Sequence, residues 1–389
     1  MLEPQHPLVL HVRVVSGTGG GPDKTILNSP RFLRTLGYRS TCVYLRDPAD
    51  RGFDVLVRRA VERHAPLVAV DDFGIRDWRI ISRLRSVLDA DPPIIWHGHD
   101  YKSNLLGLIL KRWFPQMRLV TTVHGWVQKT RKTPLYYFID RQCLPRYEAV
   151  ICVSRDLQDR CRKLGVEEKK LRLIDNAIAL DDYAVEQTQA EAKRQFGVPD
   201  PQRLVVAVGR LSYEKGFDLL IQAVAELVRG GHDIGLLIAG DGGEREVLAQ
   251  RIDDAGVSDR VRLLGFVDDP RLVYRAADVY VLSSRREGLP NVVLEAMAMG
   301  IPVVATKIAG MPDLIEDRVN GVLVSPDSHV ALSSAINELL TDAGLARKIG
   351  DAGRKTVEDR FSFQRRMEKV VQVYQSIGVE AIGNDSRLT

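Results

Sequence analysis

The sequence predicts an α/β protein with two doubly wound parallel sheets, one in each half of the chain. Three observations lead to this fold class: the length, the alternation of strand-like and helix-like segments, and the return of that alternation after a polar break. At 389 residues the chain is too long for one ordinary core and suits two domains. Short β-rich runs that alternate with amphipathic helices are typical of parallel strands joined by helices. We therefore expect ligands at the carboxyl ends of strands and in a crevice between the domains.

The first half supplies one set of these segments. Strands are predicted at 8–15, 40–45, 67–72, 93–98, 118–125, 148–154 and 171–178. Helical patterns lie between most of them, including 54–64 and 77–88. Pro30 stands within the first helical pattern, 25–37, and is expected to kink or split that helix. The polar stretch 180–202 ends in a proline-containing segment that is typical of a loop. We therefore expect a domain boundary near 190.

The second half repeats the pattern. Strands are predicted at 203–211, 234–242, 260–267, 278–284, 301–306 and 321–326, with helices at 217–229, 244–256, 291–299 and 329–341. A last amphipathic helix, 363–377, is expected to pack back toward the first domain, ahead of a frayed tail. The predicted domains are thus 1–190 and 191–362, followed by the segment 363–389.

The composition is that of a soluble globular protein, with 45% hydrophobic and 27% charged residues. No apolar run approaches the roughly 18 residues that a membrane-spanning helix needs. The first residues lack the basic region of a signal peptide, so we expect a cytoplasmic protein. The four cysteines form no CxxC pair, which favours buried thiols over a disulfide framework or structural zinc. They are Cys42, Cys143, Cys152 and Cys161.

The net charge of +4 conceals a basic segment. Residues 101–170 carry 15 Lys+Arg against 6 Asp+Glu. Basic residues there mix with Trp113, Phe114 and Trp126, and they cluster in the block 128–132. This mixture suits an anionic partner such as a phosphate or a phospholipid surface, although an ordinary solvated surface would look the same. No nucleic-acid-binding motif accompanies it, so nucleic acid is not an expected partner.

A glycine-rich turn, GTGGGP (17–22), follows the first strand and precedes a helix. Consecutive glycines such as Gly19 and Gly20 allow close backbone approach to a ligand, and the next helix N-terminus is a natural anion site. The spacing is not GxGxxG and there is no Walker lysine. A plain tight turn therefore remains an alternative interpretation.

A second turn, GRLSYEKGFD (209–218), follows the first strand of the second half. Arg210 and Lys215 are five residues apart across this turn, and Gly216 opens the next helix. Two cations that converge at a strand end suit a diphosphate, Arg through its fork and Lys as a point charge. The alternative is a solvated loop with a glycine at the start of a helix.

The stretch EGLPNVVLEAMAMG (287–300) carries two carboxylates, one in a loop and one inside the helix that follows. Glu287 precedes the helix, while Glu295 lies one turn beyond Asn291 on the same face. A diphosphate on the helix N-terminus would leave a sugar for one carboxylate and a ribose for the other. Glu295 stands among apolar residues, where an uncompensated charge is costly unless a group donates to it. The alternative is that both glutamates only favour the helix dipole.

Three histidines close two strands of the first half: His97 and His99 end one, and His124 ends another. They could form a metal site, but no carboxylate cluster has matching spacing. Hydrogen bonding to substrate hydroxyls or phosphate is the preferred interpretation.

Together these motifs resemble those of retaining GT-B glycosyltransferases of family 4. The resemblance runs from SGTGGGPDKTILN (16–28) to EDRFSFQRRMEKVVQVYQSI (358–377). Its most specific part, EGLPNVVLEAMAMGIPVVAT (287–306), is similar to the E-x7-E motif, and 209–223 and 121–126 agree in order. The fold implied is GT-B, two Rossmann-like domains that face each other across a cleft, the first binding the acceptor and the second the nucleotide sugar.

The resemblance also implies residue roles. Arg210 and Lys215 would bind the donor diphosphate and stabilise the leaving group, Glu287 would hold the sugar hydroxyls, and Glu295 the ribose. The remaining implied contacts are the backbone of Leu289, Pro290, Asn291 and Val292 along sugar and phosphates, Gly19 and Gly20 at the diphosphate, and His124 at the sugar. The acceptor side would lie near His99, Tyr101 and Lys102, and the first helix, which contains Pro30, borders the acceptor in the family.

The activity implied is transfer of a sugar, from a UDP-sugar by expectation, with retention at the anomeric carbon. No metal or other cofactor is expected, because Arg, Lys and the helix N-terminus neutralise the leaving phosphate. The expected acceptor is a lipid-linked glycan or polysaccharide precursor at the inner face of the cell membrane. Two alternatives remain: a soluble transferase that makes a small glycoside, and a catalytically silent nucleotide-binding scaffold. A phosphorylase of GT-B type would need pyridoxal phosphate, and the chain is short for that class.

Overall fold

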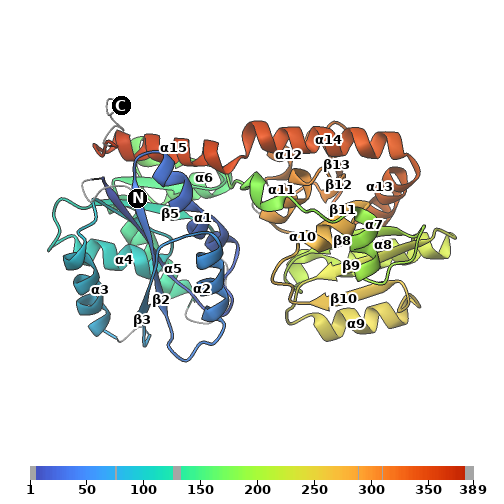
Figure 1. Ribbon diagram of the computed structural model, residues 1–389, viewed down its shortest axis with the longest axis horizontal. Coiled ribbons are helices and arrows are strands. Elements are labelled where there is room, and N and C mark those ends of the chain that lie inside the picture. Colours follow the sequence, from blue (N-terminus) through green and yellow to red (C-terminus); the bar gives the residue numbers. More distant parts are fainter. Residues whose placement is uncertain (1–5, 75–76, 126–132, 288, 309, 382–389) are drawn as a thin grey trace. The chain divides into compact units, whose positions relative to one another are not determined.

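The computed structural model describes residues 6–74, 77–125, 133–287, 289–308 and 310–381 (Figure 1). The chain forms two compact units. The first unit comprises Met1–Asn176 and Phe363–Thr389, and the second comprises Ala177–Ser362. Each is a parallel sheet with helices on both faces, so the predicted fold class is confirmed.

The chain leaves the first unit after Asn176, and not near 190 as the polar stretch suggested. The reason is that this stretch folds onto the second unit. Gln189 Nε2 donates to the Ala277 carbonyl at 2.7 Å, and Lys193 Nζ lies 2.6 Å from an Asp278 carboxylate oxygen. The stretch is therefore polar because it forms a surface helix whose side chains bind residues of the second unit.

The first sheet has the strand order β3-β2-β1-β4-β5-β6-β7, with all neighbours parallel. The strands are β1 (Leu8–Val14), β2 (Arg39–Arg46), β3 (Leu67–Asp71), β4 (Ile95–Gly98), β5 (Arg118–Val123), β6 (Ala149–Cys152) and β7 (Leu171–Leu173). The helices around it are α1 (Gly21–Thr35), α2 (Phe53–Glu62), α3 (Arg79–Ala90), α4 (Tyr101–Leu110), α5 (Thr133–Cys143), α6 (Arg155–Lys163) and α15 (Phe363–Ser376). The four cysteines of this unit are free and buried, as predicted.

The second sheet has the order β10-β9-β8-β11-β12-β13, again parallel throughout. Its strands are β8 (Arg203–Val208), β9 (Ile234–Ala239), β10 (Val261–Gly265), β11 (Val279–Leu282), β12 (Val303–Thr306) and β13 (Val322–Val324). Its helices are α7 (Gln189–Gln195), α8 (Phe217–Arg229), α9 (Arg245–Asp254), α10 (Arg271–Ala276), α11 (Asn291–Ala298), α12 (Met311–Leu314), α13 (His329–Thr341) and α14 (Ala343–Arg360). Buried aliphatic side chains line both faces of this sheet.

Each sheet reverses its strand order at one place, between β1 and β4 in the first and between β8 and β11 in the second. Loops that leave the two strands at such a switch point diverge to opposite faces, and the gap between them is where doubly wound proteins bind ligands. The glycine-rich turn follows β1, the Arg210/Lys215 turn follows β8, and the Glu287 loop follows β11. The predicted site motifs therefore fall at the two switch points.

Helix α1 is continuous from Gly21 to Thr35 although Pro30 lies inside it, so the predicted split is wrong. Pro30 has no N–H to offer the carbonyl of Ile26, one turn earlier. The Cys42 thiol of the neighbouring strand β2 donates to that carbonyl at 3.4 Å. A substitute donor from the sheet thus satisfies the carbonyl that the proline leaves free.

Helix α15 closes the first unit and lies beside α1 (Figure 1). The Phe363 ring contacts the Phe32 ring at a centroid distance of 4.9 Å. The Tyr38 hydroxyl donates to the Val379 carbonyl at 2.9 Å, and Tyr38 is fully buried. The last helix is therefore part of the first unit's core.

Candidate functional site

The turn after β8 and the loop after β11 are bound together into one structural element of the second unit. The Ser283 hydroxyl donates to the Lys215 carbonyl at 2.9 Å, and the Arg285 amide donates to the Glu214 carbonyl at 2.8 Å. The Arg285 guanidinium forms two 2.8 Å bonds to Asp218 at the start of α8. Because buried and bidentate contacts hold both segments, their side chains have fixed positions relative to each other.

Two of the predicted site residues meet within this element. Lys215 Nζ forms an ion pair with a Glu287 carboxylate oxygen, although the residues are 72 positions apart. The Ser284 hydroxyl donates to the same oxygen at 3.1 Å. The Lys215 and Glu287 side chains are 21% and 15% exposed, so the pair remains accessible to solvent. The structure thus brings together a cation and a carboxylate that the sequence assigned to different parts of one ligand.

Glu295 lies one turn inside α11 and is fully buried. The Tyr274 hydroxyl donates to its Oε2 atom at 2.7 Å. Burial, together with the neighbouring Glu295 carboxylate, raises the pKa of Tyr274 well above its ordinary value, so this hydroxyl keeps its proton and acts as a donor. The donor that the sequence required for Glu295 comes from the protein itself.

The predicted backbone contacts, Leu289 to Val292, form the entry to α11. Pro290 is the N-cap residue and has extended backbone angles, and Asn291 begins the helix. Leu289 and Pro290 are buried, whereas Asn291 and Val292 are half-buried. Glu287 of the Lys215–Glu287 pair lies four residues before Asn291, the first residue of the helix.

Arg210 is the second residue of the turn after β8 and is exposed. The stem of Lys215 packs against the adjacent Gly209, where a Cβ would lie 3.4 Å from Lys215 Cε. Gly216 has a φ of 62°, and a Cβ there would lie 2.1 Å from the Ser283 carbonyl oxygen. Only glycine allows the turn to approach the β11 loop this closely.

The glycine turn of the first unit surrounds a buried carboxylate. Asp23 Oδ2 accepts from the Gly20 amide at 2.6 Å, and Asp23 Oδ1 lies 3.0 Å from Arg13 Nε. Gly19 has a φ of 75°, and a Cβ there would lie 2.7 Å from the Leu56 side chain. Because its amide is bonded to Asp23, Gly20 does not offer this N–H to a ligand in the present conformation.

The three predicted histidines lie together, and a fourth, His11, joins them. His11 Nδ1 is 3.0 Å from His99 Nε2, and His99 Nδ1 is 3.0 Å from His124 Nε2. His97 contacts the Tyr374 hydroxyl at 2.7 Å and the Thr122 hydroxyl at 2.8 Å. Burial lowers the pKa of all four histidines, that of His11 to about 3, so these rings are neutral at physiological pH.

The predicted acceptor-side residues stand at the start of α4. Tyr101 is half-buried, and Lys102 forms an ion pair with Asp72 while also donating to the Gly74 carbonyl at 3.1 Å. Asp100 caps this helix by accepting from the Lys102 and Ser103 amides at 3.0 and 2.9 Å. The Lys102 charge is therefore already committed to a carboxylate.

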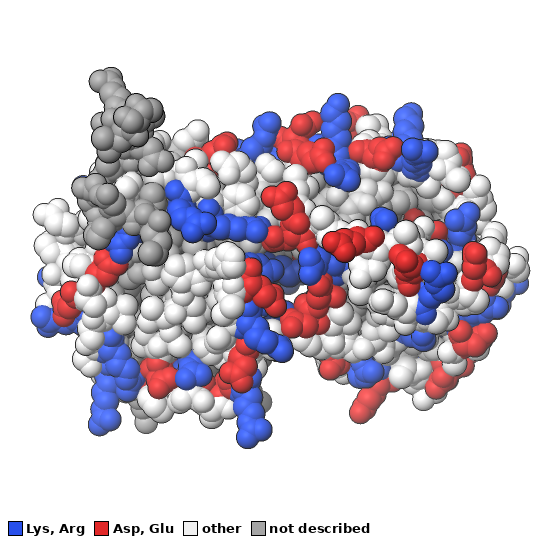
Figure 2. Space-filling view, in the orientation of Figure 1, with Lys and Arg blue, Asp and Glu red and all other residues white. Residues whose placement is uncertain are grey.

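The basic segment 101–170 carries much of its charge in local ion pairs. Lys111 pairs with Glu148, and Arg162 pairs with Asp159 and Glu168. On the face drawn in Figure 2, basic and acidic side chains are interspersed. Trp126 and the block 128–132 lie outside the described residues. Trp113 is 47% exposed, with the Arg85 guanidinium 5.7 Å from its ring. Within the described part of the chain, every helix is too short or too polar to cross a membrane.

Sequence reasoning missed four contributors: His11, Tyr274, Ser284 and Tyr374. A signal existed for His11, since it interrupts an apolar strand and lies opposite His97 in the β1–β4 register. Ser284 ends the strand that leads to Glu287. The two tyrosines could not be found this way, because they reach the site from helices α10 and α15 and do not follow a strand.

Both halves of the chain match models of known protein families. Residues 19–182 match the model of Glycosyltransferase Family 4, and residues 188–356 match that of Glycosyl transferases group 1. An uncharacterized glycosyltransferase of Methanocaldococcus jannaschii is 31% identical over 310 residues, which are 76% of this chain and 78% of that protein. Rhizobium meliloti LpsE, a lipopolysaccharide core biosynthesis glycosyltransferase, is 30% identical over 273 residues, or 69% and 76% of the two chains.

The fold comparison extends over nearly the whole chain. The crystal structure of Anabaena HepE in complex with UDP-glucose has a TM-score of 0.81 to this protein at 23% identity. The match covers 95% of this chain and 100% of HepE. Similarity at this level of identity shows a common GT-B fold.

Proposed function

Because this chain belongs to the group 1, or family 4, glycosyltransferases, we propose that it moves a sugar from a UDP-sugar to a lipid-linked or polysaccharide-precursor acceptor. The transfer proceeds with retention of the anomeric configuration and without a metal ion. HepE, which shares the fold, was crystallised with UDP-glucose, and LpsE acts in lipopolysaccharide core biosynthesis. These two proteins support the donor class and the acceptor class, respectively.

The observation that carries the proposal is the Lys215–Glu287 ion pair at the entry to α11. Lys215 and Ser284 both contact the Glu287 carboxylate. When the donor binds, its diphosphate competes for Lys215, and the sugar hydroxyls replace Lys215 as donors to Glu287. The ion pair thus holds both side chains in position for this exchange.

The charges of this element suit the departure of a nucleoside diphosphate. Negative charge develops on the leaving phosphate, where Arg210, Lys215 and the first N–H groups of α11 supply positive charge. Cations positioned before the reaction need no rearrangement as the bond breaks, so a metal ion is not required. The leaving phosphate oxygen accepts the proton of the acceptor hydroxyl, which attacks the same face of the sugar.

The remaining roles follow the resemblance. Glu295 accepts hydrogen bonds from the ribose, with Tyr274 holding the carboxylate in position from the other side. His124 hydrogen-bonds the transferred sugar, and Gly19 and Gly20 approach the diphosphate. His99, Tyr101 and Lys102 face the acceptor, for which Lys102 would exchange Asp72 for an acceptor phosphate.

The test begins with thermal melting in the presence of UDP, GDP, ADP and their sugars, with a chelator present throughout. A ligand at about 100 times its dissociation constant stabilises the folded protein by about 2.7 kcal/mol, which shifts a melting curve visibly. We expect a shift with UDP and UDP-sugars that the chelator does not abolish. The absence of a shift with every nucleotide would contradict the transferase and favour the silent scaffold.

Two further measurements define the reaction and the acceptor. Proton NMR of the first product formed from an α-linked donor should show an α-linkage; a β-linkage would contradict retention. Binding to vesicles of anionic phospholipid, released by salt, would support a peripheral location at the membrane face. Transfer to small water-soluble acceptors without vesicle binding would instead favour the soluble glycoside-forming enzyme.

A further inference from the structure

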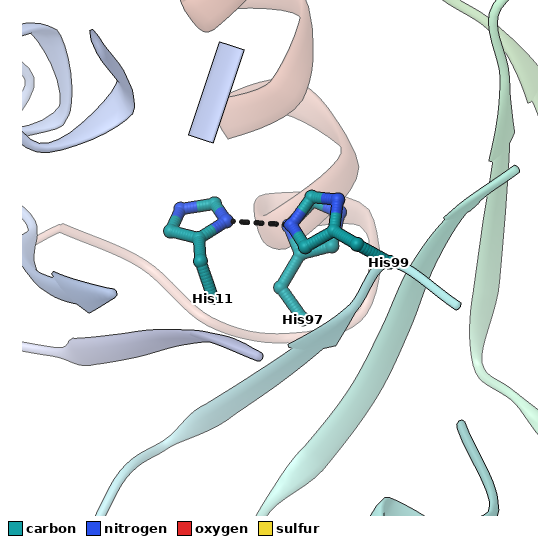
Figure 3. Close-up of side chains that lie close together, drawn as sticks. All are labelled: His11, His97 and His99. Carbon is teal, nitrogen blue, oxygen red and sulfur yellow. Dashed lines mark hydrogen bonds between the residues drawn. The ribbon is translucent and has the colours of Figure 1, made fainter. Parts of the chain in front are cut away.

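The three imidazoles of His11, His99 and His124 form a continuous hydrogen-bonded row. His11 Nδ1 contacts His99 Nε2, and His99 Nδ1 contacts His124 Nε2, each at 3.0 Å. Figure 3 shows His11 pointing at His99 from β1, with the hydrogen bond between them drawn. The row runs from the buried interior at His11, which is 1% exposed, to the half-buried His124.

Each ring in this row is neutral, so each has one N–H and one lone pair. The pKa of His99 and that of His124 are lowered well below the usual value by burial and by neighbouring positive groups, which include Arg13. Only two proton orders satisfy both hydrogen bonds. In the outward order every Nδ1 carries the proton and donates toward His124. In the inward order every Nε2 carries it and donates toward His11.

The buried end of the row decides between these orders. Across the described part of the chain, nothing hydrogen-bonds to His11 Nε2, although this atom is buried. The inward order would leave a buried N–H without an acceptor, whereas the outward order leaves only a lone pair unused. Orphaned buried N–H groups are the rarer of the two in proteins. The outer end carries no such penalty, because the half-buried His124 can donate to water or to a ligand.

Arginine charges act on both ends of the row. Arg366 is buried and donates to the Ile174 carbonyl at 3.0 Å, and its positive charge helps to lower the pKa of both His11 and His124. Arg13, which helps to lower the pKa of His99 and His124, is paired with Asp23 at 3.0 Å. These charges favour neutral rings, and the choice of proton order rests on the unpaired His11 Nε2 atom.

A metal ion is the other way to use clustered imidazoles. The ligand atoms of His11, His97 and His99 all lie within 4.8 Å of one another. However, both His97 nitrogens are already hydrogen-bonded, one to Tyr374 and one to Thr122. The His97 ring stacks on His99 with a centroid distance of 4.6 Å and an angle of 11°. His97 therefore holds the row in place as a stacked neighbour.

We propose that His11 and His99 are positioning residues that fix His124 as the Nδ1–H tautomer, so that it donates a hydrogen bond to a substrate oxygen. The proposal rests on the proposed function in taking His124 as the residue that meets the substrate. Its ligand is a hydroxyl or phosphate oxygen of the sugar nucleotide. His124 Nε2 is occupied by the proton of His99, so His124 does not serve as a general base through that atom.

The direct test is ¹⁵N NMR of the full chain labelled at histidine, at pH 7.5 and without substrate. Signals are assigned from single His→Gln variants, and the two tautomers differ clearly in their ring-nitrogen shifts. We expect the Nδ1–H form at His11, His99 and His124, in contrast to the Nε2–H form that free histidine prefers. Nε2–H or imidazolium signals at His124 would overturn the proposal, as would shifts of the His97 nitrogens on adding Zn²⁺.

A pair of variants tests the positioning role. Gln at position 99 can accept from His11 and donate to His124, whereas Leu can do neither. We expect His99→Leu to lower kcat about tenfold more than His99→Gln, a size typical of losing the bond that orients a site histidine. His124 should return to the Nε2–H form in His99→Leu alone, and equal kcat values in the two variants would count against the role. If His99→Leu does not fold, the wild-type spectrum still decides.

The spectrum separates this proposal from the proposed function, because it requires neither substrate nor turnover. If the protein shows Nδ1–H signals but no transferase activity, the proposed proton order is supported and the proposed function is contradicted. An active transferase with an Nε2–H form at His124 would do the reverse. His64→Gln, at an exposed histidine of the same unit, serves as the control for both measurements.

Discussion

The two switch points of this protein share a topology and differ in chemistry. Between β1 and β4, neutral imidazoles are packed against one another and shielded from solvent. Between β8 and β11, a partly exposed lysine and glutamate form an ion pair, with a buried carboxylate held by a tyrosine one turn further on. The first arrangement suits uncharged hydrogen bonding, and the second suits exchange of charge with an anionic ligand. Equivalent positions in one fold can thus be specialised through a few side chains.

The largest expected effect comes from removing the cations of the second switch point. Arg210→Ala combined with Lys215→Ala should weaken binding of the nucleoside diphosphate by about 3–6 kcal/mol, because charge-assisted hydrogen bonds contribute about 1.5–3 kcal/mol each. Isothermal titration with UDP measures the loss. Arg347→Ala, at an 87% exposed residue of α14, is the control. Unchanged UDP binding in the double variant would contradict the assignment of the diphosphate to this site.

Next in size is the loss of the loop carboxylate. Glu287→Ala should reduce kcat about 100-fold or more, as removal of one preorganised polar group does in other enzymes. The fold should persist, because Glu287 is in a solvent-accessible loop. Steady-state turnover and circular dichroism check the two statements. Glu246→Ala, at an exposed glutamate of α9, should retain full activity, and turnover in Glu287→Ala equal to this control would refute the sugar-holding role.

The hydrogen bond to the buried Glu295 carboxylate at the second switch point should contribute to the stability of the second unit. Tyr274→Phe removes the 2.7 Å bond to Glu295 and leaves a fully buried charge with one donor fewer. The free energy of unfolding of the second unit should fall by about 1–3 kcal/mol, the cost of an unsatisfied buried polar group. Hydrogen exchange of the β8 and β11 amides measures it. Tyr213→Phe, at an exposed tyrosine, should leave exchange unchanged; equal protection in both variants would show that Glu295 does not depend on Tyr274.

The stability of the first unit should depend on pH, because of the histidines at the first switch point. The folded-state pKa values of its histidines lie below the unfolded value of about 6.5, that of His11 at about 3. Between these pKa values the unfolded chain binds more protons, so stability is complete above pH 6.5 and is lost as pH falls. As the pH falls from 7 to 5.5, each such histidine should lower the free energy of unfolding by about 1 kcal/mol.

Urea unfolding followed by tryptophan fluorescence isolates this effect, because all four tryptophans belong to the first unit. They are Trp78, Trp96, Trp113 and Trp126. His97→Gln should flatten the pH dependence by the contribution of one histidine, whatever its baseline stability. His64→Gln, at an exposed site, should not. An unchanged slope in His97→Gln would mean that His97 titrates in the folded protein as it does when unfolded.

Local patterns were enough to predict most of the fold. Helices α8 and α13 have the predicted bounds, because apolar periodicity and clear end signals coincide there. Helix α14 was not predicted, since its sequence contains Gly344, Gly350 and Gly353. The structure explains Gly350: a Cβ would lie 2.2 Å from the Gly300 carbonyl oxygen. Glycine there serves close packing, which is a tertiary requirement that a local pattern does not reveal.

The candidate site was predictable wherever its residues follow a strand. Arg210, Lys215 and Glu287 were found this way, because parallel strands bring their carboxyl ends to one edge. The Lys215–Glu287 pair was not foreseen, since it depends on how the β11 loop is held against the β8 turn. Likewise, the role of His11 depends on β1 lying beside β4, a neighbour relation that no local pattern fixes.

Helix α15 gives the order of synthesis a structural meaning. The ribosome completes every residue of the second unit before it reaches Phe363, whereas the first unit still lacks its last helix at that moment. That helix brings Tyr374 to His97 and Arg366 to the carbonyl of Ile174. The unit whose strands emerge first is therefore the unit whose core is finished last, and the row of His11, His99 and His124 acquires its full surroundings only after the second unit has been synthesised.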